Sequence, residues 1–327
     1  MLFVDNAGMT DPRVNLALEE HLLRNVRVDE PILLFYINEP AVILGRNQNT
    51  LAEIDPDYVA EKGIHVVRRL SGGGAVFHDL GNLNFSFITN GDEHLHDFAR
   101  FTEPVVAVLR GLGVEAALQG KSDIFANGRK ISGNAQYLSR GRMFSHGTLL
   151  FDTSIEQMLL SLNPRQVQIE SKAVQSVRNF VANIRDLLPS GWDIARLRQA
   201  LLEGVFGSTA VPTYDLSDED WAQVQEIADT RYRTWEWNYG RSPDFNVQKQ
   251  GKTPAGHVEA HIDVADGVIR GAKFLGNFAS TQDVAVLEEQ LVGVRYEKGA
   301  LVTAVTHLNL TPYFGALSHD EFVTLLY

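Results

Sequence analysis

The sequence contains no cysteine. This absence excludes disulfide bonds, thiolate metal sites and every mechanism that uses a cysteine nucleophile. It also fits a reducing compartment, and we expect a soluble, cytoplasmic protein. Residues 1–20 carry charged side chains along their length, unlike a signal peptide, and no stretch approaches the ~20 apolar residues of a membrane span.

Positive charge is also in short supply. The chain has 29 Lys and Arg residues against 41 Asp and Glu residues, a net charge of −12. General nucleic-acid binding needs a basic surface, so the composition argues against that class. Two local basic pairs stand out, Arg68-Arg69 and Arg129-Lys130. The sequence also lacks internal repeats and low-complexity tracts, which excludes solenoid and disordered architectures.

The remaining composition is that of a globular protein. A chain of 327 residues with 44% hydrophobic and 21% charged residues can bury one large core or two modest ones. Apolar spacing predicts a helix over 12–27, capped by Asp11, and another over 98–112, broken near Pro104. Short apolar runs predict strands over 32–37, 41–44, 64–68, 76–77 and 83–88, with a hairpin turn at 79–82.

Further strands of the same sheet are expected over 122–125, 130–135 and 147–151, and a mainly helical region over 154–206. Short spacings leave little room for crossover helices, so we predict an α+β fold with a mixed or antiparallel sheet. We place a large domain over 1–237 and a linker over 238–250. A small α/β C-terminal domain follows over 251–327, as a βαβ-like or βαα unit.

The most informative segment runs from Arg68 to Asp79, with the sequence RRLSGGGAVFHD. Successive glycines let backbone N–H groups converge on an anion, because no side chain blocks close approach. Arg68 and Arg69 add donors suited to phosphate or carboxylate. The segment is neither GxGxxG nor a P-loop, so dinucleotide and P-loop sites are disfavoured. A tight bulge is the alternative, which the paired arginines and Ser71 make less favourable.

A second group of residues surrounds Asn127-Gly128, which suits a type I′ hairpin turn and places Lys130 at the start of the returning strand. A lysine beside a triphosphate would stabilise charge that builds on the α-phosphate. An exposed turn lysine is the simpler alternative. Asp123 could share Mg²⁺ with phosphate oxygens, although one acid is a weak metal signal and a structural aspartate is an equal alternative.

Two histidines lie close to these motifs, His78 and His146. His146 could contact a substrate or satisfy a backbone carbonyl. Because no carboxylate stands at an obvious orienting spacing, we expect a structural role for each of them. The sequence contains no HxxxH pair or other pattern typical of zinc.

Taken together, these residues resemble the lipoate–protein ligase family in its long form with a C-terminal accessory domain. The resemblance rests on residues 68–87, 45–49, 127–133 and 146–150 and, late in the chain, on 238–243 and 313–315. It implies a biotin/lipoate ligase-like catalytic domain, which adenylates (R)-lipoate with ATP and Mg²⁺. The lipoyl group then passes to a lysine of the glycine cleavage H protein or of E2 subunits of 2-oxoacid dehydrogenases.

The resemblance also assigns residues, and we expect a monomer that binds neither nucleic acid nor membrane. Arg69 and Gly74-Ala75-Val76-Phe77 would bind ATP, and Lys130 would contact both the adenylate and the lipoate carbonyl. Gly72, Gly73 and His146 are the further candidates for lipoate. The sequence departs from the family pattern at Ser122, Ser145 and Phe180, which affects acyl or acceptor preference more than adenylation.

Three alternatives remain. An ATP-independent lipoyl or octanoyl transferase would, by family resemblance, use a cysteine, which this chain lacks. A biotin ligase would carry a different glycine-rich signature, of GRGR type. A catalytically silent lipoyl-binding protein is disfavoured by the presence of Arg69, Gly72–Gly74 and Lys130. Lipoate and octanoate are not distinguished by the motifs.

Overall fold

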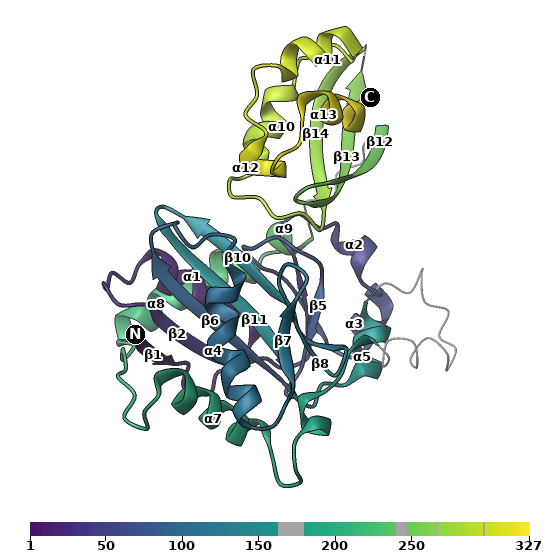
Figure 1. Ribbon diagram of the computed structural model, residues 1–327. Coiled ribbons are helices and arrows are strands. Elements are labelled where there is room, and N and C mark those ends of the chain that lie inside the picture. Colours follow the sequence, from purple (N-terminus) through teal and green to yellow (C-terminus); the bar gives the residue numbers. More distant parts are fainter. Residues whose placement is uncertain (163–179, 240–246, 266, 297) are drawn as a thin grey trace. The chain divides into compact units, whose positions relative to one another are not determined.

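Figure 1 shows the computed structural model, which describes residues 1–162, 180–239, 247–265, 267–296 and 298–327. The chain forms two compact units, each with its own hydrophobic core. The first unit consists of Met1–Ile43, Ile54–Val67 and Val76–Asn238. The second consists of Leu44–Glu53, Arg68–Ala75 and Tyr239–Tyr327. The glycine-rich loop therefore belongs to the second unit.

A five-stranded sheet forms the centre of the first unit. Its strands lie in the order β1 (Leu2–Asp5), β2 (Ile32–Ile37), β6 (Asn82–Asn90), β11 (Arg142–Leu150) and β10 (Asn134–Ser139). The pair β1 and β2 is parallel, and all other neighbours are antiparallel. The sheet is thus mixed, which confirms the predicted α+β class.

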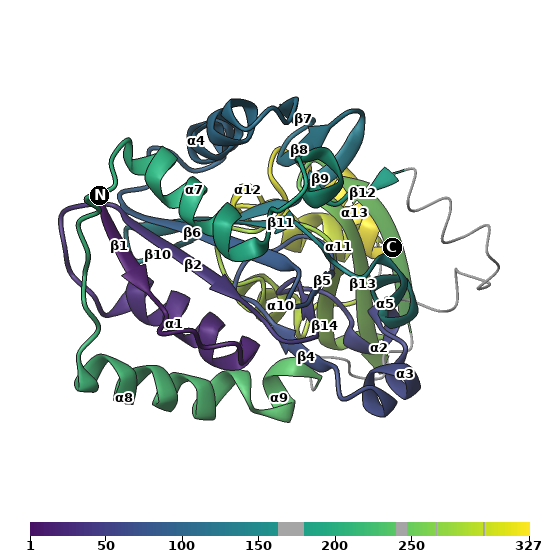
Figure 2. The same ribbon diagram turned by 90° about the horizontal axis from the view of Figure 1, so that it is seen from below.

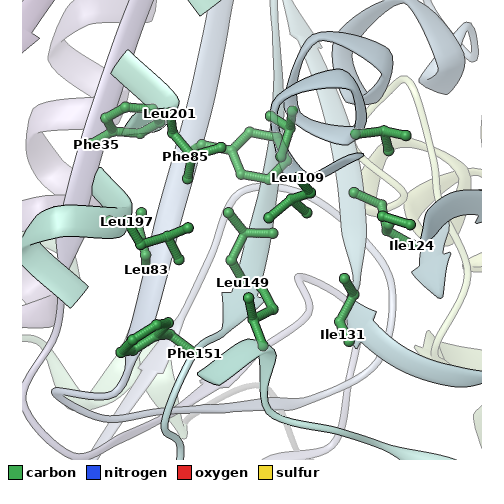
Figure 3. Packing of buried hydrophobic residues seen from close by; sticks show 14 of the residues in the cluster. Phe35, Leu83, Phe85, Leu109, Ile124, Ile131, Leu149, Phe151, Leu197 and Leu201 are labelled. Carbon is green, nitrogen blue, oxygen red and sulfur yellow. The ribbon is translucent and has the colours of Figure 1, made fainter. Parts of the chain in front are cut away.

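Alternate residues of a strand point to opposite faces, and both faces of this sheet are covered by helices. Figure 2 shows α4 (Phe98–Gly111) and α7 (Ile194–Phe206) on one face, and α1 (Pro12–Arg24) and α8 (Asp218–Ile227) on the other. The α4 and α7 face holds the main core, in which Phe35, Leu83, Phe85 and Leu149 pack together (Figure 3). The opposite face carries more polar residues.

Two small three-stranded sheets complete the strands of this region. One has the order β4 (His65–Arg68), β3 (Ala41–Leu44) and β5 (Val76–His78), and the other β7 (Ala116–Gln119), β8 (Asp123–Ala126) and β9 (Arg129–Ser132). The hairpin predicted at 79–82 is therefore wrong, because β5 pairs with β3 whereas β6 pairs with β2 and β11. The predicted strand over 130–135 is two strands of different sheets, β9 and β10, separated at Gly133.

The helix predictions are largely confirmed. Asp11 caps α1, accepting a hydrogen bond from the backbone N–H of Arg13, and Pro12 occupies the first turn. The break predicted near Pro104 is wrong, since α4 continues through that residue. Phe101, Val105 and other α4 side chains are buried on one face, and this packing offsets the hydrogen bond that a proline removes.

The remaining elements of the first unit are short. They are α3 (Pro56–Glu61), α5 (Ile155–Ser161), the 3-10 helix η1 (Ile184–Leu187), the π-helix η2 (Ala228–Tyr232) and α9 (Trp235–Asn238). The helical region predicted over 154–206 agrees with α5, η1 and α7, while residues 163–179 lie outside the described part of the chain. The motif positions 240, 242 and 243 also lie outside it.

The second unit contains an antiparallel sheet of β12 (Val247–Thr253), β13 (Gly256–Ala265) and β14 (Val268–Gly276). Its helices are α2 (Thr50–Glu53), α10 (Ala285–Leu291), α11 (Lys298–Val305), α12 (Thr311–Phe314) and α13 (His319–Leu326). The βαβ-like alternative is wrong, because the strands are antiparallel, and β12 was not predicted. Over the residues that the structure describes, none of the helices is long and apolar enough to traverse a bilayer.

Candidate active site

The glycine-rich loop, residues 68–75, is joined to residues 44–50 through the backbone. The N–H of Arg69 donates to the carbonyl of Leu44, and the N–H of Arg46 donates to the carbonyl of Ser71, each at 2.9 Å. A β-carbon placed on Gly45 would lie 1.9 Å from the carbonyl oxygen of Gly73. Glycine at position 45 is therefore required for the two segments to approach this closely.

Arg68 is fully buried and serves this pair of segments rather than a ligand. Its Nη1 donates to the carbonyls of Gly45, Arg46 and Gln48 at 3.0, 3.0 and 2.6 Å, and Nη2 donates to Thr50 Oγ1 at 2.7 Å. A guanidinium has enough donors to hold several acceptors at once. Both arginines were predicted to bind an anion, whereas the structure places Arg68 in the framework of the loop.

Arg69 folds over the glycine run itself. Its Nε donates to Ser71 Oγ at 2.9 Å, and Nη2 donates to the carbonyls of Gly72 and Gly74 at 2.7 and 2.9 Å. Gly73 between them has φ +95°, a conformation that favours glycine. Carbonyl oxygens repel an anion, so their engagement by a cation leaves the loop better suited to bind one.

The predicted ATP-binding run 74–77 differs in exposure along its length. Gly74 is exposed, and a β-carbon there would meet nothing within 4 Å. Ala75 and Val76 are half-buried, whereas the side chain of Phe77 is buried and its residue pairs with Val42 in the β3–β5 ladder. Open space for a ligand is therefore found at Gly74, and Phe77 has only its backbone to offer.

Gly72 is in close contact with the chain that follows β14. A β-carbon on Gly72 would lie 2.4 Å from the carbonyl oxygen of Phe278. In the same part of the second unit, the N–H of Gly276 donates to the carbonyl of Asn47 at 2.6 Å, and Arg46 forms a 2.7 Å ion pair with Asp283. The space beside Gly72 is thus filled by protein, and a lipoate contact there stays a prediction.

Lys130 and Asp123 come together in the first unit, in the hairpin formed by β8 and β9. Asn127 and Gly128 both have positive φ, 49° and 74°, which confirms the type I′ turn. The turn brings Lys130 Nζ to 2.8 Å from Asp123 Oδ2, with both side chains about 30% exposed. In this structure Asp123 is the ion-pair partner of Lys130. Among the described residues there is no cluster of three potential metal ligands.

Because Gly133 has no side chain, it leaves space for the Lys130–Asp123 ion pair. A β-carbon on Gly133 would lie 3.3 Å from Lys130 Nζ and 3.8 Å from Asp123 Oδ1. The backbone of Lys130 is held by the N–H of Ala182, which donates to its carbonyl at 3.0 Å. The lysine is therefore fixed along its backbone, while its charged end stays accessible to solvent.

His146 lies in β11 on the sheet face that α1 covers, and it has an acidic partner. Its Nδ1 is 2.9 Å and 3.1 Å from the two carboxylate oxygens of Glu19, and both residues are buried. The ring also packs against Phe144, with centroids 4.6 Å apart. The expectation that no carboxylate orients His146 is wrong, because Glu19 is brought to it by the packing of α1 on the sheet.

His78 agrees with the structural role expected for it. Its Nδ1 lies 2.9 Å from the amide nitrogen of Asn38, and both are buried. Asp79 next to it binds the backbone N–H groups of Gly81 and Ser154 at 3.0 and 2.7 Å. Burial raises the pKa of Asp79, although these hydrogen bonds lower it in part. Both side chains therefore hold the chain that leads from β5 into β6.

Comparison with known proteins gives two family matches. Residues 11–206 match the lipoyl protein ligase A/B catalytic domain, and residues 242–326 match the bacterial lipoate protein ligase C-terminus. Lipoate-protein ligase LplJ of Bacillus subtilis is 46% identical over the full length of both chains.

Two solved structures are similar in fold. One is a lipoate-protein ligase A bound with ATP, with a TM-score of 0.60 and 32% identity, which covers 73% of this chain and 97% of that one. The other is the bipartite lipoate protein ligase of Thermoplasma acidophilum, described with its E2 lipoyl domain, with a TM-score of 0.66 and 30% identity. It covers 75% of this chain and 98% of that one.

Proposed function

We propose, since this chain belongs to the lipoate–protein ligase family, that it activates (R)-lipoate with ATP and transfers the lipoyl group to an acceptor lysine. The observation that carries the proposal is Lys130, whose ammonium group is held 2.8 Å from Asp123 and about 30% exposed. A cation fixed in this way can exchange its carboxylate partner for a phosphate. We therefore assign Lys130 as the catalytic residue.

In the first step, a carboxylate oxygen of lipoate attacks the α-phosphorus of ATP. The bond from that phosphorus to the bridging oxygen breaks, and pyrophosphate leaves with the electron pair. Lys130 stabilises the charge that develops on the α-phosphate and, afterwards, contacts the acyl carbonyl of the lipoyl-adenylate. The loop ordered by Arg69 binds the nucleotide through residues 74–77, so that positioning and charge supply the catalysis.

Mg²⁺ fits these residues only in part. This ion is commonly held by one or two carboxylates together with substrate phosphates, and Asp123 offers one accessible carboxylate. Bound there, the ion would neutralise phosphate charge. Asp123 is therefore the candidate ligand, and its release from Lys130 would accompany nucleotide binding.

In the second step, the neutral amine of an acceptor lysine attacks the adenylate carbonyl. A new amide bond forms and the nitrogen releases one proton to solvent, while the bond from the carbonyl carbon to the phosphate oxygen breaks and AMP leaves with its electron pair. No covalent enzyme intermediate is needed, in agreement with a chain that lacks cysteine. We propose lipoyl domains of E2 subunits and the glycine cleavage H protein as acceptors, with the reaction taking place in the cytoplasm on a monomeric enzyme.

The test is pyrophosphate release by the purified protein with ATP and lipoate, and then with octanoate and biotin. We expect release with lipoate, and loss of release in Lys130→Ala. Lys121→Ala, which changes an exposed lysine near the start of β8, is the matched control and should behave like the wild type. Absence of release with every acid would contradict the ligase proposal and favour a silent lipoyl-binding protein.

Octanoyl transfer from a carrier protein without ATP would instead indicate the ATP-independent transferase. Such a transferase would need a nucleophile other than cysteine, because the chain has none. Its reaction would differ from the proposed ligase reaction, which forms no covalent enzyme intermediate.

A further inference from the structure

Asn134, the first residue of β10, connects two sheets of the first unit. Its side-chain Nδ2 donates to the backbone carbonyl of Ser122 at 2.6 Å and to Ser132 Oγ at 3.1 Å. Ser122 immediately precedes Asp123, at the beginning of β8. The carboxamide of Asn134 therefore joins the five-stranded sheet to the strand that carries the partner of Lys130.

The other end of the same carboxamide is packed against a glycine. Asn134 Oδ1 is buried without a hydrogen-bond donor, and it lies 1.9 Å from the position that a β-carbon of Gly147 would take. Asn134 and Gly147 face each other in the β10–β11 ladder. The orientation of the amide follows from its neighbours, because a flipped amide would bring its oxygen against the carbonyl of Ser122.

A buried acceptor without a donor is costly and needs an explanation. Here the hydrogen bond from Nδ2 to the carbonyl of Ser122 fixes the orientation of the carboxamide. The missing side chain of Gly147 leaves space for Oδ1. Oδ1 of Asn134 thus remains without a hydrogen bond, whereas Nδ2 donates to the carbonyl of Ser122. This donated hydrogen bond fixes the start of β8.

The residue before Asn134 links this contact to the ion pair. Gly133 exchanges two hydrogen bonds with Thr148, at 3.1 Å to the backbone N–H and 3.2 Å to the hydroxyl. A β-carbon added to the same Gly133 would lie 3.3 Å from Lys130 Nζ and 3.8 Å from Asp123 Oδ1. The Gly133–Asn134 dipeptide is therefore hydrogen-bonded to β11, and it lies next to the Asp123–Lys130 ion pair.

We propose that Asn134 is a positioning residue that sets the separation of Asp123 and Lys130 by holding the carbonyl of Ser122. This inference rests on the proposed function for its effect on catalysis. Without the amide donor, the start of β8 is released from β10, and the carboxylate moves relative to the lysine. A displacement of about 1 Å at a reacting centre can lower a rate by about 100-fold, so the effect on the chemical step is large.

The first test compares Asn134→Ala and Asn134→Leu with the wild type in pyrophosphate release. Both variants lose the donor to Ser122 without adding a charge, and the leucine keeps a similar volume if the alanine variant folds poorly. We expect kcat to fall by about 10- to 100-fold, while KM for ATP and lipoate changes by less than about threefold. Gln136→Ala is the matched control, since Gln136 follows on the same strand face and donates to Ser145 instead.

The second test does not depend on activity. Reductive methylation with formaldehyde and a mild reductant, followed by mass spectrometry, reports the accessibility of each lysine amine. We expect the labelling rate of Lys130 to rise several-fold in Asn134→Ala, with the exposed Lys252 of β12 unchanged as an internal reference. If the wild-type protein releases no pyrophosphate, the proposed function is contradicted. The labelling experiment would still test whether Asn134 sets the position of Lys130.

Folded Asn134 variants with wild-type kcat and wild-type labelling of Lys130 would overturn the inference. So would a rise in KM at unchanged kcat, because that pattern indicates lost substrate binding rather than a changed separation of Asp123 and Lys130.

Discussion

The carboxylate of Glu19 lies 2.9 Å from Nδ1 of His146, although 127 positions separate the two residues in the sequence. Glu19 belongs to α1, and His146 belongs to a strand of the sheet face beneath that helix. A carboxylate on one ring nitrogen determines which nitrogen carries the proton and how the ring is oriented. Glu19 thus fixes the orientation of the His146 ring, and His146 is a residue that we propose as a lipoate contact.

The first prediction concerns this pair. Glu19→Ala removes a buried partner of His146 and should lower the free energy of unfolding by about 1–3 kcal/mol. It should also raise KM for lipoate, because His146 is a proposed lipoate contact. Urea unfolding and pyrophosphate release measure the two effects.

The neighbouring Glu20 is the matched control for Glu19. It is equally buried and bonded to Arg24, Arg231 and Tyr232 at 2.8, 2.7 and 2.9 Å. Glu20→Ala should therefore destabilise the protein and leave KM for lipoate unchanged. An equal change of KM in both variants would argue against a specific role of Glu19.

The second prediction concerns Arg68. A lysine has one ammonium group and cannot reach three carbonyls and a hydroxyl as the guanidinium does. Arg68→Lys should lower the free energy of unfolding by at least about 3 kcal/mol, measured in urea. Arg129→Lys, at a half-buried arginine of the β8–β9 hairpin, should stay within about 0.5 kcal/mol. Equal stability of the two variants would contradict the framework role of Arg68.

The third prediction separates two glycines. Gly45→Ala would place a methyl group 1.9 Å from the carbonyl of Gly73, so it should both destabilise the protein and raise KM for ATP. Gly74→Ala meets nothing within 4 Å and should leave the unfolding free energy unchanged. Its KM for ATP should nevertheless rise, because the proposed nucleotide approaches there. A Gly74→Ala variant with normal KM would place the nucleotide elsewhere.

The fourth prediction concerns pH. Burial alone would raise the pKa of Asp11, but hydrogen bonds from the side chain and backbone of Arg13 lower it overall. A lowered pKa in the folded state means that Asp11 adds stability above its unfolded value of about 3.9, and that this stability is lost as the pH falls through the folded value.

Asp11→Asn keeps a capping side chain without this titration. Its stability deficit against the wild type should therefore be largest near neutral pH and shrink below about pH 4. Chemical unfolding from pH 7 to pH 2 measures the difference. Asp29→Asn, at an exposed acid before β2, serves as the comparison, and a deficit for Asp11→Asn that grows toward acid would contradict the assignment.

Local elements were predictable where one stretch of chain contains all the information. The strands over 32–37 and 41–44 and the Asn127-Gly128 turn agree with the structure, because apolar runs and positive-φ residues act locally. The hairpin at 79–82 failed for a different reason. Strand patterns report which side chains are buried but not which strand is the neighbour, and β5 and β6 lie in different sheets.

In the candidate site, too, some relationships between residues are local in sequence and others arise only from tertiary packing. Lys130 and Asp123 flank one turn, so their encounter follows from local geometry. Glu19 and Asn134 carried no signal in the sequence, because a carboxylate or an amide becomes informative only through its neighbour. Gly147 stood in the recognised motif 146–150, yet its contact with Asn134 depends on the pairing of β10 with β11. Gly45 stood in a recognised motif, yet its contact with Gly73 depends on how two separate loops pack.

By itself, the sequence indicated which groups are available for chemistry in this protein. The absence of cysteine excludes a cysteine-linked intermediate, and the sequence predicts anion binding by the glycine run with Arg69 and by Lys130. Only the tertiary structure decided the use of two other charges: Arg68 for the loop and Glu19 for His146. The physical reason is that residue type sets what a side chain can bind, whereas electrostatic and hydrogen-bond energies depend on distance and burial, which arise only when distant segments pack.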